Sequence, residues 1–197
     1  MRNFLILCKL FAFGVGFMLV FVTASNIIPQ ARGEAPVVID LKNISTIDQM
    51  TELGAEIFGS EDEPGRGKCP MCHRRIGGRA PVLDGVTMRA GKRIKDPRYK
   101  GYATTGLEYI EESEECPSCF VVEGYGAPGS NDTKSPMPVT VNPPIGLSPI
   151  ERDSVIAFFQ ERDGSDITVK PITDPKTDMR WKTEGYPFKF RGKSPKS

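Results

Sequence analysis

The apolar residues near the start of the chain form one continuous block instead of a periodic pattern. From Phe4 to Val22 only Lys9 interrupts the block, which continues in mixed form to Ile28. Leu10 to Ile28 comprises 19 residues, and a helix of about this length can cross about 30 Å of hydrocarbon. The pattern therefore predicts a membrane-targeting helix over residues 1–28.

The fate of this helix depends on its flanking residues. Val22, Thr23 and Ala24 satisfy the small-residue pattern of a signal-peptidase site, but we favour a retained transmembrane anchor, because the apolar run is long enough to span. Arg2 and Lys9 precede most of the apolar residues. By the positive-inside rule, the rest of the chain is expected in the periplasm or otherwise outside the cytoplasm.

Beyond the block, apolar residues recur at helical spacing in three short segments. Residues 45–58 have Ser45 as a candidate N-cap, residues 105–115 begin with a Thr105/Glu108 capping box, and residues 148–164 begin with Ser148 followed by a proline. Long stretches without periodicity separate these segments. The pattern predicts an all-α domain of three or four short helices over residues 45–164.

The segments on either side of this domain have no sustained period: residues 29–44 carry Pro, Gly and Arg, and residues 165–197 are proline-rich and net basic. Residues 29–44 are interpreted as a linker, and residues 165–197 as an extension that contacts partner subunits. With 17 Pro and 20 Gly in 197 residues, the composition is that of one loop-rich domain.

Charge is balanced overall but uneven along the chain. The net charge of +1 gives no reason to expect a nucleic-acid partner. Residues 66–100 contain eleven Lys or Arg and two Asp, whereas residues 111–115 contain four Glu. We interpret both as solvated faces, with a docking surface for an oppositely charged partner as the alternative.

The segment CPMCH, Cys69 to His73, has the spacing of a c-type haem attachment site. Two thiols at this spacing can bond the two vinyl groups of one porphyrin while the adjacent imidazole binds the iron. His73 is the single histidine of the chain, which weakens the alternative of a zinc site built from Cys and His. We expect one covalent haem on Cys69 and Cys72, with His73 as the proximal iron ligand.

The second iron ligand cannot be histidine, so a methionine thioether is the expected donor. Met88 lies only 15 residues after His73, and Met179 lies in the C-terminal extension. Met137 stands between two prolines in SPMPV, where a stiff backbone could hold its sulfur over the iron. We expect Met137 to be the distal ligand, and two filled axial positions favour electron transfer over catalysis.

With these residues, the chain from about 47 to 164 resembles the class I mono-haem cytochromes c. Gly54 and Phe58 match the glycine and the aromatic residue at which the family's first and last helices cross, with Phe158 or Phe159 facing them. The stretch GLEYIEES, followed by FVVEGY and MP, is similar to the family's approach to its distal methionine.

The resemblance also implies second contacts around the haem. Pro81 matches the residue whose carbonyl accepts a hydrogen bond from the proximal histidine, and Arg79 is a further candidate for haem contact. Two features depart from the family pattern, namely the pair Cys116 and Cys119 and the 33 residues that follow the last helix.

The pair Cys116 and Cys119 admits several interpretations. A second haem would need a histidine where Phe120 stands, and 43 residues separate the pair from Cys72, too many for an ordinary four-cysteine zinc ribbon. In an oxidising compartment a local disulfide is the simplest expectation. A redox-active dithiol remains open.

The resemblance implies a membrane-anchored electron carrier that is no enzyme by itself. Its expected partners are a redox-protein donor or acceptor and other subunits of a respiratory or photosynthetic complex, such as a quinol-oxidising alternative complex III. If Met137 does not bind iron, the alternative is a five-coordinate haem enzyme, a peroxidase or gas-binding protein. A module held by zinc or disulfides is the remaining alternative.

Overall fold

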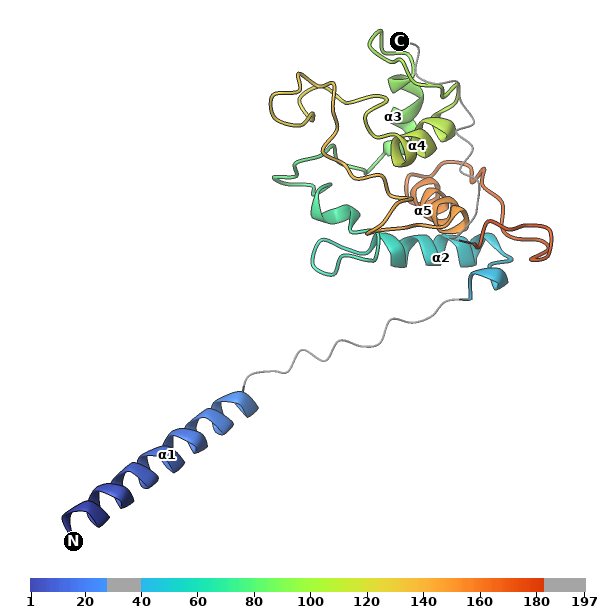
Figure 1. Ribbon diagram of the computed structural model, residues 1–197. Coiled ribbons are helices and arrows are strands. Elements are labelled where there is room, and N and C mark those ends of the chain that lie inside the picture. The colour runs from blue at the N-terminus through green and yellow to red at the C-terminus, as the bar shows by residue number, and fades with distance from the viewer. Residues whose placement is uncertain (28–39, 183–197) are drawn as a thin grey trace. The chain divides into compact units, whose positions relative to one another are not determined.

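The computed structural model describes residues 1–27 and 40–182, and the chain divides into two units, Met1–Ile39 and Asp40–Ser197 (Figure 1). Within the described residues the secondary structure is helical, with five α-helices, two short 3-10 helices and no strand, which confirms the all-α class. The elements are α1 Arg2–Ile27, η1 Leu41–Asn43, α2 Ile47–Phe58, η2 Cys69–Met71, α3 Val86–Arg93, α4 Gly106–Glu115 and α5 Pro149–Arg162.

Helix α1 has the length and composition expected of a membrane anchor or a signal sequence. Its apolar stretch covers 24 residues, Arg2–Ser25, which corresponds to about 36 Å of helix. The Thr23 hydroxyl donates to the Leu19 carbonyl at 2.6 Å and the Ser25 hydroxyl to the Val22 carbonyl at 2.9 Å. These polar groups are therefore satisfied inside the helix, as a hydrocarbon environment requires.

Helix α2 begins one residue later than the sequence suggested. Thr46, not Ser45, is the N-cap: its hydroxyl accepts from the Gln49 amide at 3.2 Å, and the Gln49 side chain accepts from the Thr46 amide at 3.2 Å. This reciprocal pair is a capping box, which the sequence hides because Ser45 and Thr46 are both good N-caps.

Helices α2 and α5 cross in close contact in the second unit (Figure 1). A methyl group at Gly54 would overlap the backbone carbonyl of Ser154, so only glycine allows this approach. One turn further on, the Phe58 ring lies 5.4 Å from the Phe158 ring and 5.5 Å from the Phe159 ring, measured between centroids. The expected contact between Gly54, Phe58 and the last helix is confirmed, with both aromatic residues taking part.

Helices α3 and α4 pack against each other (Figure 1). Helix α4 has the expected capping box, in which the Thr105 hydroxyl accepts from the Glu108 amide at 3.2 Å. Helix α3 was not expected, since its N-cap is Gly85, which has no side chain to signal a start. The Asp163 carboxylate, at the end of α5, accepts instead from the amides of Gly85 at 2.9 Å and Thr87 at 3.1 Å.

Residues 40–44 and 165–182, on either side of the predicted domain, pack on it, while residues 29–39 of the expected linker lie outside the described residues. Ile44 and Ile172 are buried, and the Ile172 amide donates to the Ile44 carbonyl at 2.8 Å. The Arg180 carbonyl accepts from the Ile150 amide at 3.0 Å. Residues 40–44 are thus no linker, and residues 165–182 pack on their own domain, while 183–197 lie outside the described residues.

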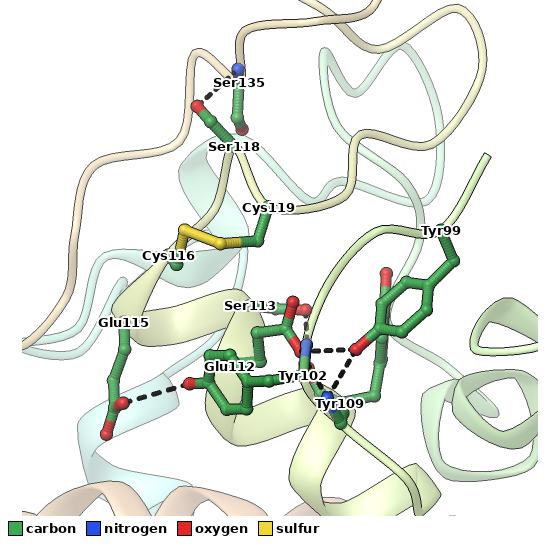
Figure 2. Close-up of a disulfide and its surroundings, with 11 residues drawn as sticks. Tyr99, Tyr102, Tyr109, Glu112, Ser113, Glu115, Cys116, Ser118, Cys119 and Ser135 are labelled. Atoms are coloured by element: carbon green, nitrogen blue, oxygen red, sulfur yellow. Dashed lines mark hydrogen bonds between the residues drawn. A yellow bond between two sulfur atoms is a disulfide. The ribbon is translucent and has the colours of Figure 1, made fainter. Parts of the chain in front are cut away.

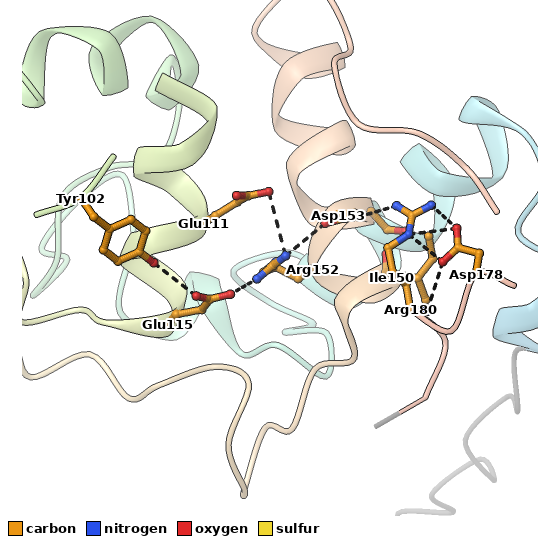
Figure 3. A network of polar contacts seen from close by, with 9 residues as sticks. Tyr102, Glu111, Glu115, Ile150, Arg152, Asp153, Asp178 and Arg180 are labelled. Atoms are coloured by element: carbon orange, nitrogen blue, oxygen red, sulfur yellow. Dashed lines mark hydrogen bonds and ion pairs between the residues drawn. The ribbon is translucent and has the colours of Figure 1, made fainter. Parts of the chain in front are cut away.

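A network of ion pairs joins α4, α5 and this terminal segment (Figure 3). Arg152 of α5 pairs with Glu115 of α4, and lies 3.5 Å from the Asp153 carboxylate. Asp153 in turn accepts from Arg180 at 2.6 Å, and Arg180 also holds Asp178 at 2.6 Å. The network ties the end of the described chain to the helix that contains the acidic run.

The acidic run itself is only partly solvated, contrary to expectation. Glu112 is 2% exposed and Glu114 is 7% exposed. The Glu112 carboxylate accepts from the Tyr99 hydroxyl, and from the amides of Tyr102 at 3.1 Å and Ala103 at 2.9 Å. It therefore fixes the turn that precedes α4 instead of facing water.

Replacing Gly54 by alanine is expected to lower the free energy of unfolding by about 3 kcal/mol, because the methyl group meets rigid backbone in α5. The matched control is Gly91→Ala in α3, where a Cβ meets nothing within 4 Å. That change should raise stability by about 0.5–1 kcal/mol through helix propensity. Denaturant unfolding of the full chain, followed by the fluorescence of its single tryptophan, Trp181, measures both. Equal stability of the two variants would contradict the close crossing.

Candidate functional site

The CPMCH segment is attached to the end of α2 by backbone hydrogen bonds. The Gly67 amide donates to the Ile57 carbonyl at 2.8 Å, just before η2 begins. The amides of Cys72 and His73 then donate to the Cys69 carbonyl at 3.2 and 3.0 Å. This tight turn gathers the two cysteines and the histidine in one small region.

His73 is oriented by the chain that follows it. Its Nδ1 lies 2.6 Å from the carbonyl oxygen of Pro81. Because a carbonyl can only accept, Nδ1 carries the proton and Nε2 keeps a free lone pair. Burial lowers the pKa of His73, against the opposing effect of the Pro81 bond, and so favours the neutral imidazole that can bind a metal. The expected bond to Pro81 is present.

All four expected haem and iron residues line one cavity of about 370 Å³. This volume lies within the range of about 300–1,000 Å³ that holds small ligands and cofactors. Apolar side chains from several elements form much of the wall, among them Val86 of α3, Ile110 of α4 and Val155 and Phe159 of α5. The expected residues in the wall are Cys69, Cys72, His73 and Met137.

Among the described methionines, Met71 and Met137 line this cavity, whereas Met88 and Met179 do not. Met71 lies inside the CPMCH turn itself. Arg79 also lines the cavity, with its Nε 3.2 Å from Cys72 Sγ. The structure therefore brings together Cys69, Cys72, His73, Arg79, Pro81 and Met137, although these residues span almost 70 positions of sequence.

The residues present fit a covalently attached haem. An apolar cavity of this size, two thiols at the attachment spacing, a neutral imidazole with a free Nε2 and a thioether form the donor set that a c-type haem uses. Burial, with a smaller effect of Glu114, raises the pKa of the Cys69 thiol to about 12.

Cys116 and Cys119 form a disulfide directly after α4 (Figure 2). Residues inside this short ring and next to it, Pro117 and Phe120, line the cavity. Within the described residues, no group of three or more His, Cys, Asp or Glu side chains is arranged to hold a metal ion.

Glu114 is a cavity residue that the sequence did not reveal. It is 7% exposed, and within the described residues its Oε2 has no hydrogen-bond partner. Burial raises the pKa of Glu114 to about 8; Arg152 opposes the rise, while Asp153, Glu111 and Glu115 add to it. The carboxyl group is therefore mostly protonated at neutral pH.

The raised pKa makes stability depend on pH. Because the pKa of Glu114 is about 8 in the folded chain and near 4.5 otherwise, the folded state binds more protons between these values. The free energy of unfolding should therefore fall as pH rises towards about 8, by a few kcal/mol at about 1.4 kcal/mol per pKa unit. Glu114→Gln should flatten this dependence, whereas Glu52→Gln, an exposed change in α2, should leave it intact. Identical pH profiles of Glu114→Gln and wild type would contradict the assignment.

Comparison with known proteins does not identify the chain, because it matches no protein-family model and no curated protein. The cavity combines cysteine, histidine and methionine side chains from the CPMCH turn and from the loop between α4 and α5.

Proposed function

We propose that the protein is a membrane-anchored mono-haem c-type cytochrome that transfers electrons. The observation that carries this proposal is the shared cavity, in which a CPMCH turn and a methionine 64 positions beyond His73 line the same apolar space.

When bound, a haem supplies a one-electron change between ferric and ferrous iron. Cys69 and Cys72 would hold it covalently, and His73 would bind the iron through Nε2. The Pro81 carbonyl keeps the imidazole in the required tautomer and orientation, and raises its basicity. The apolar wall would surround a bound haem with nonpolar side chains, which together with a methionine ligand would favour the reduced state and raise the potential.

The presence of Met137 in the cavity wall favours a carrier over a haem enzyme. If His73 and Met137 both held the iron of a bound haem, no position would be left for oxygen, peroxide or another substrate. The protein would then need partners as donor and acceptor, which we place among redox proteins and the subunits of a respiratory or photosynthetic complex, such as a quinol-oxidising one.

We further propose that α1 remains as an anchor and that the haem unit lies outside the cytoplasm. Arg2 and Lys9 lie near the start of α1, before most of its apolar residues, which favours this orientation. An extracytoplasmic location is consistent with covalent haem attachment. It is also consistent with the Cys116–Cys119 disulfide, since disulfides form and persist in oxidising compartments.

Covalent attachment is tested by mass. The mature protein, isolated from its own membrane or from a host that attaches haem, should contain one haem on the peptide with Cys69 and Cys72. The double variant Cys69→Ser/Cys72→Ser should lose it completely, whereas Cys8→Ser in α1 should keep it. A mature wild-type peptide without added haem mass would contradict the proposed function.

Iron ligation by Met137 is tested by spectroscopy. The ferric wild type should show the weak long-wavelength absorption band that reports methionine sulfur on iron. Met137→Ala should abolish this band and lower the reduction potential while the haem stays attached. Met88→Ala, a change at a methionine that is 65% exposed, is the control and should keep both. A band that survives Met137→Ala would overturn the assignment of the ligand, and a wild type without the band would favour the five-coordinate enzyme.

A further inference from the structure

The loop that carries Met137 is closed by its own hydrogen bonds. The Asp132 carboxylate accepts from the amides of Gly124 and Gly126, both at 2.8 Å. The Ala127 amide donates to the Lys134 carbonyl at 2.7 Å. These bonds fold the chain back on itself between residues 124 and 134. Ser135 therefore returns to the start of the loop that follows α4, near Ser118.

Two contacts join the returning chain to the rest of the unit, one on each side of Met137. Before it, the Ser135 amide donates to the Ser118 hydroxyl at 3.0 Å (Figure 2). After it, the Thr140 amide donates to the Glu114 carbonyl at 3.0 Å, and the Thr140 hydroxyl donates to the same carbonyl at 3.3 Å. The Met137 amide itself donates to the Ser135 hydroxyl at 3.1 Å.

Both contacts end on one short stretch, residues 114–119. This stretch is the end of α4 together with the ring that the disulfide closes (Figure 2). Within the ring the Cys119 amide donates to the Cys116 carbonyl at 2.8 Å. The Cys116 amide donates to the Glu112 carbonyl at 2.7 Å, which joins the ring to α4. Ser118 is exposed, so the ring, not burial, restricts where its hydroxyl can lie.

Met137 depends on such external support because of its neighbours. Pro136 and Pro138 have no amide hydrogen, so they cannot donate backbone hydrogen bonds that would fix the loop. The methionine side chain has three rotatable bonds and no charge, and so it does not orient itself. The position of its sulfur is therefore set by where the backbone at residues 135–140 is held.

We propose that the Cys116–Cys119 disulfide is a positioning element for Met137. It fixes the turn that presents the Ser118 hydroxyl, next to the end of α4 that presents the Glu114 carbonyl, and these two acceptors hold the backbone on both sides of the methionine. The inference rests on the proposed function, since it concerns the distal ligand of a haem. So small a ring adds little to global stability, less than the roughly 3 kcal/mol of a 15-residue loop, and its effect is local.

The test measures how readily an added ligand displaces Met137. Imidazole is titrated into the ferric, haem-loaded full chain while the methionine–iron band is recorded. Because the apparent affinity for imidazole rises with the fraction of molecules in which methionine has left the iron, a loosened loop binds imidazole more tightly. Two variants loosen it by different routes: Cys116→Ser/Cys119→Ser opens the ring, and Ser118→Ala removes one acceptor but keeps the disulfide.

Both variants should bind imidazole about three- to tenfold more tightly than wild type and show a weakened band, as expected from the loss of one hydrogen bond. Two controls should match wild type. Cys8→Ser changes a cysteine of α1, and Ser60→Ala removes an exposed hydroxyl that accepts from the Glu63 amide at 3.0 Å, a bond of the same kind as that of Ser118.

The outcomes separate this inference from the proposed function. If the wild type carries haem and shows the band, but Ser118→Ala and the double variant bind imidazole as wild type does, the positioning role is overturned and the cytochrome remains. A wild type without haem or without the band overturns both. Should the double variant fail to mature, Ser118→Ala decides alone, since it leaves every cysteine in place.

Discussion

The close approach of α2 and α5 at Gly54 determines the relative positions of the residues that line the cavity. From the end of α2, the Ile57 carbonyl holds Gly67 and so places the turn with Cys69. From α5, Val155, which directly follows Ser154 at the crossing, and Phe159, about one turn further on, line the cavity. A shift of either helix would therefore move the attachment turn against the apolar wall that faces it.

A second set of contacts transmits the position of α5 to the chain after His73. Arg162 donates to the Leu83 carbonyl at 2.6 Å, and Asp163 caps the start of α3 through Gly85 and Thr87. The Pro81 carbonyl that orients His73 lies just before these residues. The position of the imidazole therefore depends both on the CPMCH turn and on the contacts of α5 with the chain after Pro81. One end of α5 thus supports the side of the cavity where His73 lies, while Arg152, near its other end, joins α4.

The sequence predicted features that depend on neighbouring residues and missed those that depend on distant ones. The capping box of α4, the Ser148 start of α5 and the CPMCH turn are local patterns, and the sequence predicted them. Helix α3 was missed because its cap, Asp163, lies 78 positions from Gly85. Glu114 was taken for a solvated residue although it follows Ile110 by four positions, a spacing that puts both on one helix face and could have signalled its burial.

The two sides of the cavity differ in the same way, and this difference explains which part of the site could be inferred. On the proximal side, Cys69, Cys72, His73 and Pro81 lie within 13 residues, so their arrangement follows from one turn and one hydrogen bond. On the distal side, Met137 is placed by a loop that closes on itself and is then fixed to the end of α4. Proline spacing indicated a stiff loop, but stiffness alone does not locate a sulfur atom. Its location depends on contacts across 17 and 26 positions, which only the folded chain reveals.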